Sequence, residues 1–204
     1  NLEMGMKKEI YAKCEEAGDI VINARLLADI LRRMNGLQVT IEADDKLNCH
    51  IKCGETTFDI MGMAAEDFPE MPTVGSDKTI VIDADIFSEM VKGTIFAVAQ
   101  NEGAKPILTG IYVTIEDRIL RFVAIDGYRL AIRRHNIDIE GSFSFILSGR
   151  AVGEAVKLID EETENVEISF GDRLVSFNIS GYSFISRLLE GEFVNYQKTI
   201  PAEH

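Results

Sequence analysis

The sequence predicts an α+β protein built from repeated halves, each made of one strand, one helix and three further strands. Three observations support this prediction. First, short apolar segments end in residues that cap helices. Second, each is followed by apolar residues at helical spacing. Third, segments in which apolar and polar residues alternate come last, separated by turns that contain Gly or Asp. Because this order occurs three times, the chain is expected to be an internal repeat.

Each repeat is expected to open with a short apolar strand whose last residue starts a helix. Asn, Asp and Ser are favoured there because their side chains accept a hydrogen bond from a free backbone N–H at the helix start. The three segments are Val21-Ile22-Asn23, Val81-Ile82-Asp83 and Ile146-Leu147-Ser148.

A helix with one buried face is expected after each of these caps. Apolar residues recur there three and four positions apart, which is the spacing of one helix face. The three stripes are Leu27, Ile30, Leu31 and Met34; Phe87, Met90, Val91, Thr94, Ile95 and Val98; and Val152, Ala155, Val156 and Ile159.

Three strands are expected after each helix. The turn between the second and third strand carries Gly54, Gly127 or Gly181, and glycine tolerates the positive φ that tight hairpins require. The strands are expected at 38–42, 46–52 and 56–63; at 108–115, 119–125 and 128–134; and at 166–170, 174–179 and 183–189.

The repeats are of two kinds, arranged in the order B, A, B. The first and third share an ending, Glu66-Asp67-Phe68 and Gly191-Glu192-Phe193, which the second lacks. If one A and one B half form a domain, the opening B half is without its A half. Pro72 and Gly75-Ser76 interrupt the pattern, so the predicted domains are residues 1–75 and 76–204.

Composition favours a cytoplasmic protein with a sizeable core. The 204 residues are 46% hydrophobic and contain three cysteines. Sparse cysteines indicate a reducing compartment, and no apolar run reaches the roughly 18 residues of a membrane span. Cys49 and Cys53 lie four residues apart on a predicted strand, about 13 Å from each other, so neither a shared metal ion nor a disulfide is expected.

The sequence lacks the usual signs of an enzyme, so neither catalysis nor a cofactor is expected. Its histidines have no recognisable nucleophile partner, and it has no phosphate-binding or dinucleotide-binding glycine motif. One alternative is a hydrolase on a repeated α+β fold that uses Asp126 and Arg129. Asp126-Gly127 is, however, also a favoured pair for a hairpin turn. A second alternative is a peptide-binding module without DNA.

Basic residues gather on two of the predicted helices. The net charge of −13 argues against nucleic acid, because phosphate binding depends on Lys and Arg. Net charge does not say where the positive residues lie, however, and on charge alone ordinary helix-surface ion pairs are the favoured explanation for them. The residues are Arg25, Arg32 and Arg33 in the first helix and Arg150 and Lys157 in the third.

Several segments, in order along the chain, resemble bacterial beta sliding clamps, the beta subunit of DNA polymerase III. Leu108-Thr109-Gly110-Ile111 is similar to a strand start of the second clamp domain, and the segment 123–131, with Asp126-Gly127, to its A-T-D-G-H-R-L-A motif. The segment 187–196 is similar to the family's K-L-V-D-G-R-F-P-D-Y, and 65–69 to the close of its first domain.

The resemblance implies a processivity-clamp fold, with sheets outside and helices lining a ring around double-stranded DNA. The ring is a head-to-tail homodimer of three-domain subunits, so half of domain one and all of domain three would be missing from this chain. Phe58 and Ile60 match edge-strand positions at the subunit interface. The residues implied to face DNA are Arg25, Arg32, Arg33, Gln100, Lys105, Arg150 and Lys157.

The resemblance also implies a pocket that binds short peptides of the DNA polymerase III alpha subunit and of the clamp loader. This chain departs from the family at Ile125, where Thr is usual, at Tyr128, where His is common, and at Val194, where Pro is common. Peptide preference is therefore expected to differ. The matching positions are Leu108, Ile125, Gly127, Tyr128, Arg129, Leu130, Val194, Lys198 and Thr199.

Overall fold

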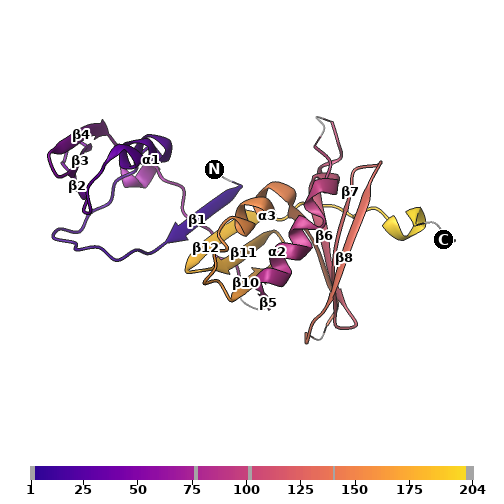
Figure 1. Ribbon diagram of the computed structural model, residues 1–204. Helices are drawn as coiled ribbons and strands as arrows, with labels where there is room; N and C mark the ends of the chain where they lie inside the picture. The colour runs from indigo at the N-terminus through magenta and orange to yellow at the C-terminus, as the bar shows by residue number, and fades with distance from the viewer. Residues whose placement is uncertain (1–2, 76–77, 101–102, 140, 201–204) are drawn as a thin grey trace. The chain divides into compact units, whose positions relative to one another are not determined.

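The computed structural model describes residues 3–75, 78–100, 103–139 and 141–200. The chain forms two compact units, one of residues 1–10 and 71–204 and one of residues 11–70 (Figure 1). Residues 76–77 at the predicted domain boundary, and 101–102 between the predicted DNA-facing residues Gln100 and Lys105, lie outside the described residues.

The larger unit contains two antiparallel sheets, which confirms the α+β prediction. One has the order β1-β12-β11-β10-β5 and the other β8-β7-β6-β9. Their strands are β1 (Met4–Lys8), β5 (Thr79–Asp83), β6 (Gly110–Glu116), β7 (Ile119–Ile125), β8 (Leu130–Asn136), β9 (Phe143–Ser148), β10 (Asn165–Phe170), β11 (Leu174–Ile179) and β12 (Tyr182–Arg187).

Two helices, α2 (Ala84–Lys92) and α3 (Gly149–Val156), pack against each other and against these sheets (Figure 1). Phe87 of α2 is fully buried and its ring contacts Phe122 of β7 and Phe177 of β11, at centroid distances of 6.2 and 6.0 Å. One helix side chain therefore joins both sheets in a single core.

The helices are shorter than their apolar stripes predict. Asp83 caps α2 as expected, but α2 ends at Lys92 with Gly93 as its C-cap, and the Thr94 hydroxyl donates to the Met90 carbonyl. Ile95 belongs to a separate 3₁₀ turn, Ile95–Ala97, which closes on Val98. The stripe continues because these residues still face the core, and burial does not require an unbroken helix.

The smaller unit consists of helix α1 (Ala24–Arg33) and the sheet β2-β3-β4, with β2 at Thr40–Ala43, β3 at Asn48–Cys53 and β4 at Thr56–Met61. Asn23 caps α1 as predicted, and its side chain accepts from the Leu26 N–H. The core is small, centred on Ile30, Cys49 and Ile51. In α1, Leu26 and Leu31 stay 45% and 38% exposed.

Three predicted strand positions are corrected by the structure. Val21-Ile22-Asn23 is not a strand, because only Val21 pairs, in an isolated bridge to Met63. The segment before Gly110 is a 3₁₀ turn, η3 (Pro106–Thr109), because Pro106 favours the start of a turn and the Leu108 N–H donates to the Lys105 carbonyl instead of to a strand. The strand expected at 128–134 begins two residues later, because Gly127 and Tyr128 form the hairpin turn.

Close packing around position 110 explains why the Leu108-Thr109-Gly110 segment ends in glycine. A Cβ there would lie 2.4 Å from the Leu147 carbonyl oxygen of β9 and 2.6 Å from the Leu189 side chain. We expect Gly110→Ala to lower the free energy of unfolding by about 1–3 kcal/mol, because the backbone of β9 must move. Chemical denaturation of the purified chain measures this. Gly171→Ala is the control, since its added Cβ meets nothing within 4 Å and should cost far less.

Candidate nucleic-acid and peptide-binding surfaces

The predicted DNA-facing cations are all exposed, and they come from both units. Arg25, Arg32 and Arg33 lie on α1, Arg150 lies on α3, and Lys157 caps the end of α3. Gln100 follows the Ile95–Ala97 turn, and Lys105 precedes η3.

Two of these cations are paired with carboxylates on their own helices. The Arg32 guanidinium lies 3.1 Å from the Asp29 carboxylate, and the Lys157 ammonium lies 2.8 Å from the Glu154 carboxylate. Within the described part of the chain, Arg25, Arg33 and Arg150 form no ion pair. These three arginines can therefore meet a phosphate without first breaking an internal contact.

Four of the predicted peptide-pocket residues, Leu108, Ile125, Leu130 and Val194, lie at or near one end of the four-stranded sheet. Ile125 and Leu130 are cross-strand partners at the β7–β8 turn, where β7 ends and β8 begins. Leu108 lies in η3, immediately before β6, and β6 pairs with β7. Val194 follows Phe193, whose ring stacks on Tyr112 of β6 at a centroid distance of 4.7 Å.

The side chains of Ile125 and Leu130 lie on the sheet face opposite the helices. Phe122 and Ala124 face α2 and the core, so the alternate residues Val123 and Ile125 point the other way. The cross-strand partners of Val123 are Tyr112 and Ile132, which puts them on the same face. This face carries an apolar surface partly covered by Phe193.

The remaining pocket positions are more dispersed. Tyr128 projects from the hairpin turn and is 93% exposed. Lys198 and Thr199 belong to the 3₁₀ turn η4 (Tyr196–Thr199), where the Thr199 hydroxyl donates to the Tyr196 carbonyl. Among the described residues, no hydrogen bond or ion pair links η4 to the β7–β8 turn. The Tyr112–Phe193 stack was missed by the sequence analysis, although Phe193 lies in the ending shared by the two B halves.

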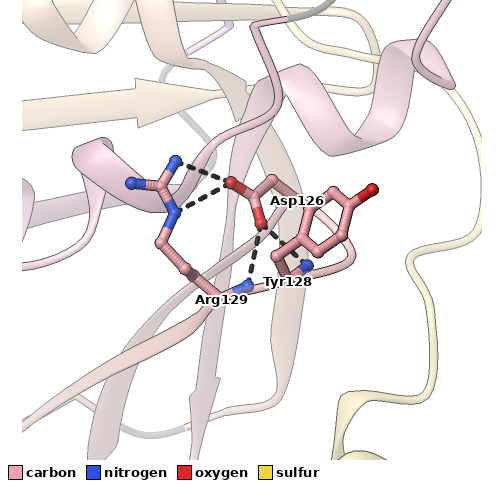
Figure 2. Close-up of polar contacts among 3 residues, drawn as sticks. All are labelled: Asp126, Tyr128 and Arg129. Carbon is pink, nitrogen blue, oxygen red and sulfur yellow. Dashed lines mark hydrogen bonds and ion pairs between the residues drawn. The ribbon is translucent and has the colours of Figure 1, made fainter.

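Asp126 organises the turn that carries Gly127, Tyr128 and Arg129. Its carboxylate accepts hydrogen bonds from the Tyr128 and Arg129 backbone N–H groups, at 3.0 and 2.9 Å. It also accepts from the Arg129 guanidinium at 3.0 and 2.7 Å. Figure 2 shows the Tyr128 ring and the Arg129 guanidinium on opposite sides of this carboxylate. Gly127 has a φ of +91°, as predicted for the turn.

These contacts hold the pKa of Asp126 at about 2, with the Arg129 guanidinium as the main cause. A carboxylate so strongly held in its ionised form cannot act as a proton donor near neutral pH, and its lone pairs are directed at backbone groups of its own turn. The arrangement therefore favours the turn interpretation of Asp126-Gly127 over the hydrolase alternative.

We expect Asp126→Asn to lower the folding stability of the chain by an amount that depends on pH. Because the folded-state pKa of Asp126 lies below the unfolded value of about 3.9, its ionised form stabilises the fold above about pH 4, and this contribution is lost as the pH falls through about 2. The stability difference between wild type and variant should therefore shrink between pH 5 and pH 2.5 in urea titrations. Asp172→Asn, in an exposed turn, is the control; a difference independent of pH would contradict this role.

The predicted interface residues Phe58 and Ile60 lie on β4, at one edge of the small sheet. Both are half-buried and pack on the core around Ile51 and Cys49, their cross-strand partners. Asp59 faces the other way, and its carboxylate lies 2.6 Å from the His50 imidazole, which raises the pKa of His50. The hydrophobic core of the smaller unit thus extends as far as its edge strand, β4.

The cysteine prediction agrees with the structure as far as the strand is concerned. Cys49 and Cys53 lie on β3 and are buried. Among the described residues, no group of three or more His, Cys, Asp or Glu side chains is placed to hold a metal ion. Within the same residues, no helix combines the length and apolar character needed to cross a membrane.

Comparisons with known proteins agree with this architecture. Residues 81–195 match the family model of the DNA polymerase III beta subunit, central domain, and residues 1–72 match that of its N-terminal domain. The beta sliding clamp of Bacillus subtilis is 31% identical over 96% of this chain and 52% of its own length. That of Halalkalibacterium halodurans is 31% identical over 99% of this chain and 53% of its own length.

Solved structures confirm the clamp fold. A putative DNA polymerase III beta subunit from Eubacterium rectale superposes with a TM-score of 0.93 at 28% identity, over 100% of this chain and 56% of that one. The DNA polymerase sliding clamp of Bacillus subtilis gives 0.91 at 28% identity, over 99% and 56%. The chain thus spans about half the length of the relatives it matches. Since one family model alone matches more than half of its residues, the chain belongs to the DNA polymerase III beta subunit family, the beta sliding clamps.

Proposed function

We propose that this chain is part of a DNA sliding clamp, a non-catalytic processivity factor that encircles duplex DNA in the cytoplasm and tethers the replicative polymerase. The observation that carries the proposal is the agreement of both family models, in order, with the repeated strand–helix–sheet halves. A ring holds DNA by topology, so its cations need only weak contact with phosphates. This is compatible with the net charge of −13.

The domain arrangement is part of the proposal. We place the C-terminal half of clamp domain one at residues 1–75 and clamp domain two at 76–204, although residues 1–10 fall in the same compact unit as 71–204. The exposed Leu26 and Leu31 on α1 support a missing half, because α2 and α3 in the larger unit cover each other. In a complete subunit, a second helix would cover α1 in the same way.

The DNA contacts are assigned to the helix-borne cations Arg25, Arg32, Arg33, Arg150 and Lys157, with Gln100 and Lys105 on the adjoining loop. Their support is exposure and, for Arg25, Arg33 and Arg150, freedom from ion pairs within the described residues. The partner subunit of a head-to-tail homodimer is assigned to the β4 edge, beside Phe58 and Ile60.

Retention on circular DNA tests the ring. In a hybrid, this chain replaces the matching half of the Bacillus subtilis relative, and the clamp loader places the hybrid on nicked circular duplex. We expect the hybrid to stay on the circle through gel filtration and to be lost once a restriction enzyme linearises the DNA. Equal retention on both forms, or loss from the circle by a correctly folded dimer, would sink the ring model.

The peptide site is proposed at the apolar end of the four-stranded sheet, for short segments of the polymerase alpha subunit and the clamp loader. Leu108, Ile125, Leu130 and Val194 supply the apolar wall, and Tyr128, Arg129, Lys198 and Thr199 supply the polar rim beside Gly127. An apolar cleft with few polar groups suits an extended peptide anchored by Leu and Phe side chains. Ile125 fills space that a threonine would leave, so smaller anchors should be preferred.

We expect Leu130→Ala to weaken binding of a fluorescent Leu- and Phe-containing clamp-binding peptide by about tenfold, since burying a leucine side chain is worth roughly 1.5–3 kcal/mol. Fluorescence anisotropy measures the effect. Leu174→Ala is the control, because Leu174 begins β11 in the other sheet and is similarly half-buried. Equal losses in both variants would place the peptide elsewhere.

A further inference from the structure

An apolar layer lies on the outer face of the four-stranded sheet, away from the helices. Val123 of β7 and Ile146 of β9 are buried, although neither belongs to the core between the sheets and the helices. Both are cross-strand partners of Tyr112, one on each side of β6. Other side chains must therefore cover this face as well, and Tyr112 lies at the centre of the covered area.

The segment after β12 supplies part of this cover. Residues 188–196, here called the crossing segment, first run beside β9, where the Leu189 N–H donates to the Ile146 carbonyl at 2.9 Å. Further along, the Phe193 ring stacks on the Tyr112 ring of β6, with ring centroids 4.7 Å apart and an angle of 11° between the ring planes. The crossing segment therefore passes from β9 to β6 over the outer face of the sheet.

The ring stack holds the middle of the crossing segment against the sheet. Among the described residues, no backbone hydrogen bond joins residues 190–195 to a strand. Gly191 has a φ of +130°, and a Cβ there would lie 2.9 Å from the Ile107 side chain, so the chain turns at this point while staying close to the sheet. Phe193 follows two residues later, and the half-buried Val194 comes directly after it. The placement of Val194 therefore depends on where the Phe193 ring packs.

Tyr112 also borders the candidate peptide site. Its cross-strand partner Val123 precedes Ile125 by two residues in β7, so Tyr112 and Ile125 are diagonal neighbours on the same sheet face. Through Phe193, the same Tyr112 ring determines where Val194 lies over that face. One side chain thus connects two walls of the site, the strand wall at Ile125 and the wall formed by the crossing segment at Val194.

We propose that Tyr112 is a positioning residue of the peptide site, which fixes Val194 as one wall of that site through its ring stack with Phe193. The proposal rests on the proposed peptide-binding function and deepens it, because it gives a role to a residue outside the pocket positions assigned above. Tyr112 lies under the crossing segment and acts without touching the peptide. Its ring supplies the surface on which Phe193 packs.

Order in the crossing segment before binding is the physical reason that this stack affects affinity. A peptide that meets a mobile wall has to order residues 190–195 as it binds, and the conformational freedom lost in this step lowers its affinity. A wall already fixed by an aromatic pair avoids this loss, since stacked rings stabilise a contact beyond the area that they bury. Tyr112 is therefore expected to raise peptide affinity by preorganising Val194.

Methyl NMR relaxation of the peptide-free chain tests whether the stack fixes Val194. Tyr112→Leu keeps an apolar side chain but removes the ring, and the methyl order parameter of Val194 is expected to fall by roughly a third, as from a rigid to a flexible group. Val113, a core residue of the same strand, should keep its value, and Tyr112→Phe should behave as wild type. No change at Val194, or an equal fall at Val113, would overturn the proposal.

Peptide binding then tests whether Tyr112 acts through Val194. With the fluorescent Leu- and Phe-containing peptide, Tyr112→Leu should weaken binding roughly two- to tenfold, and Tyr112→Phe should retain it. Val194→Ala should weaken binding about fivefold in the wild-type background but less than about twofold in the Tyr112→Leu background, where Val194 is no longer fixed. Leu130→Ala should lose about tenfold in both backgrounds, because Leu130 belongs to β8 and does not depend on the stack.

The outcomes distinguish a failure of this proposal from a failure of the proposed function. If Leu130→Ala leaves peptide binding unchanged, the peptide lies elsewhere, and the proposed function fails together with the role of Tyr112. If Leu130→Ala weakens binding but Val194→Ala loses the same factor in both backgrounds, the peptide site stands and the positioning role of Tyr112 is refuted. A loss at Val194→Ala that disappears only in the Tyr112→Leu background supports the proposal, because a general loss of stability would change the effects of both alanine variants alike.

Discussion

Replacement of Phe87 by alanine is expected to lower the free energy of unfolding of the larger unit by about 3–5 kcal/mol. Phe87 is fully buried, and its ring touches Phe122 in one sheet and Phe177 in the other. The deletion therefore opens a cavity at the junction of α2 with both sheets, where neither sheet can close it alone.

Urea denaturation followed by far-UV circular dichroism measures this loss. Phe96→Ala is the matched control, because Phe96 lies in the 3₁₀ turn just after α2 but is 53% exposed. This variant should lose less than about 1 kcal/mol of unfolding free energy. Equal losses in the two variants would mean that Phe87 does not join the sheets as described. The transition of residues 11–70, if resolved, should not move, since those residues form a separate unit.

Removal of the three helix arginines that form no ion pair within the described residues is expected to reduce duplex binding on the order of 100-fold in 50 mM salt. If Arg25, Arg33 and Arg150 each meet one phosphate, the slope of log K against log salt should become shallower by about 2.7 units. Fluorescence anisotropy with a short labelled duplex, over a series of salt concentrations, measures both quantities for the Arg25→Ala/Arg33→Ala/Arg150→Ala variant.

A control variant that removes the same charge elsewhere distinguishes the effect of where the arginines lie from the effect of net charge. Lys7→Ala/Arg121→Ala/Arg173→Ala also removes three positive charges, but these residues lie on strands or their turns and pair with Glu9, Glu116 and Glu190. We expect this variant to keep the wild-type slope. If both variants lose affinity alike, binding follows net charge, and the assignment of the helix face to DNA is wrong.

Local features of the fold could be predicted from the sequence, because they depend on neighbouring residues. The caps Asn23 and Asp83 and the turn at Gly127 are confirmed, since side-chain capping and positive φ are properties of short segments. Ser148 precedes a helix as expected, but its side chain makes no capping hydrogen bond. The C-terminal end of α2 was less predictable, because an apolar stripe indicates which residues are buried, not where the helix stops, and it continues past Gly93.

Contacts within the chain between residues distant in sequence could not be predicted from the residues alone. Alternation assigns a strand residue to a face but does not say which strand lies beside it, so the pairing of β1 with β12 appears only in the structure. The same holds for the Tyr112–Phe193 stack beside the candidate peptide site. The site positions themselves came from the resemblance, and the turn that presents Tyr128 and Arg129 has a physical basis in Asp126.

The pairing of β1 with β12 has a consequence for folding during synthesis. Met4 lies opposite Ser186, and the whole of the smaller unit is translated between these residues. At roughly 5–20 residues per second, β1 waits roughly 10–35 s for its partner strand to be made, whereas β2, β3 and β4 are joined by short turns and can pair at once. The nascent chain thus carries an unpaired strand while its neighbour along the chain is already folded, and the larger unit should be the slower of the two to complete, as contacts of large sequence separation generally are.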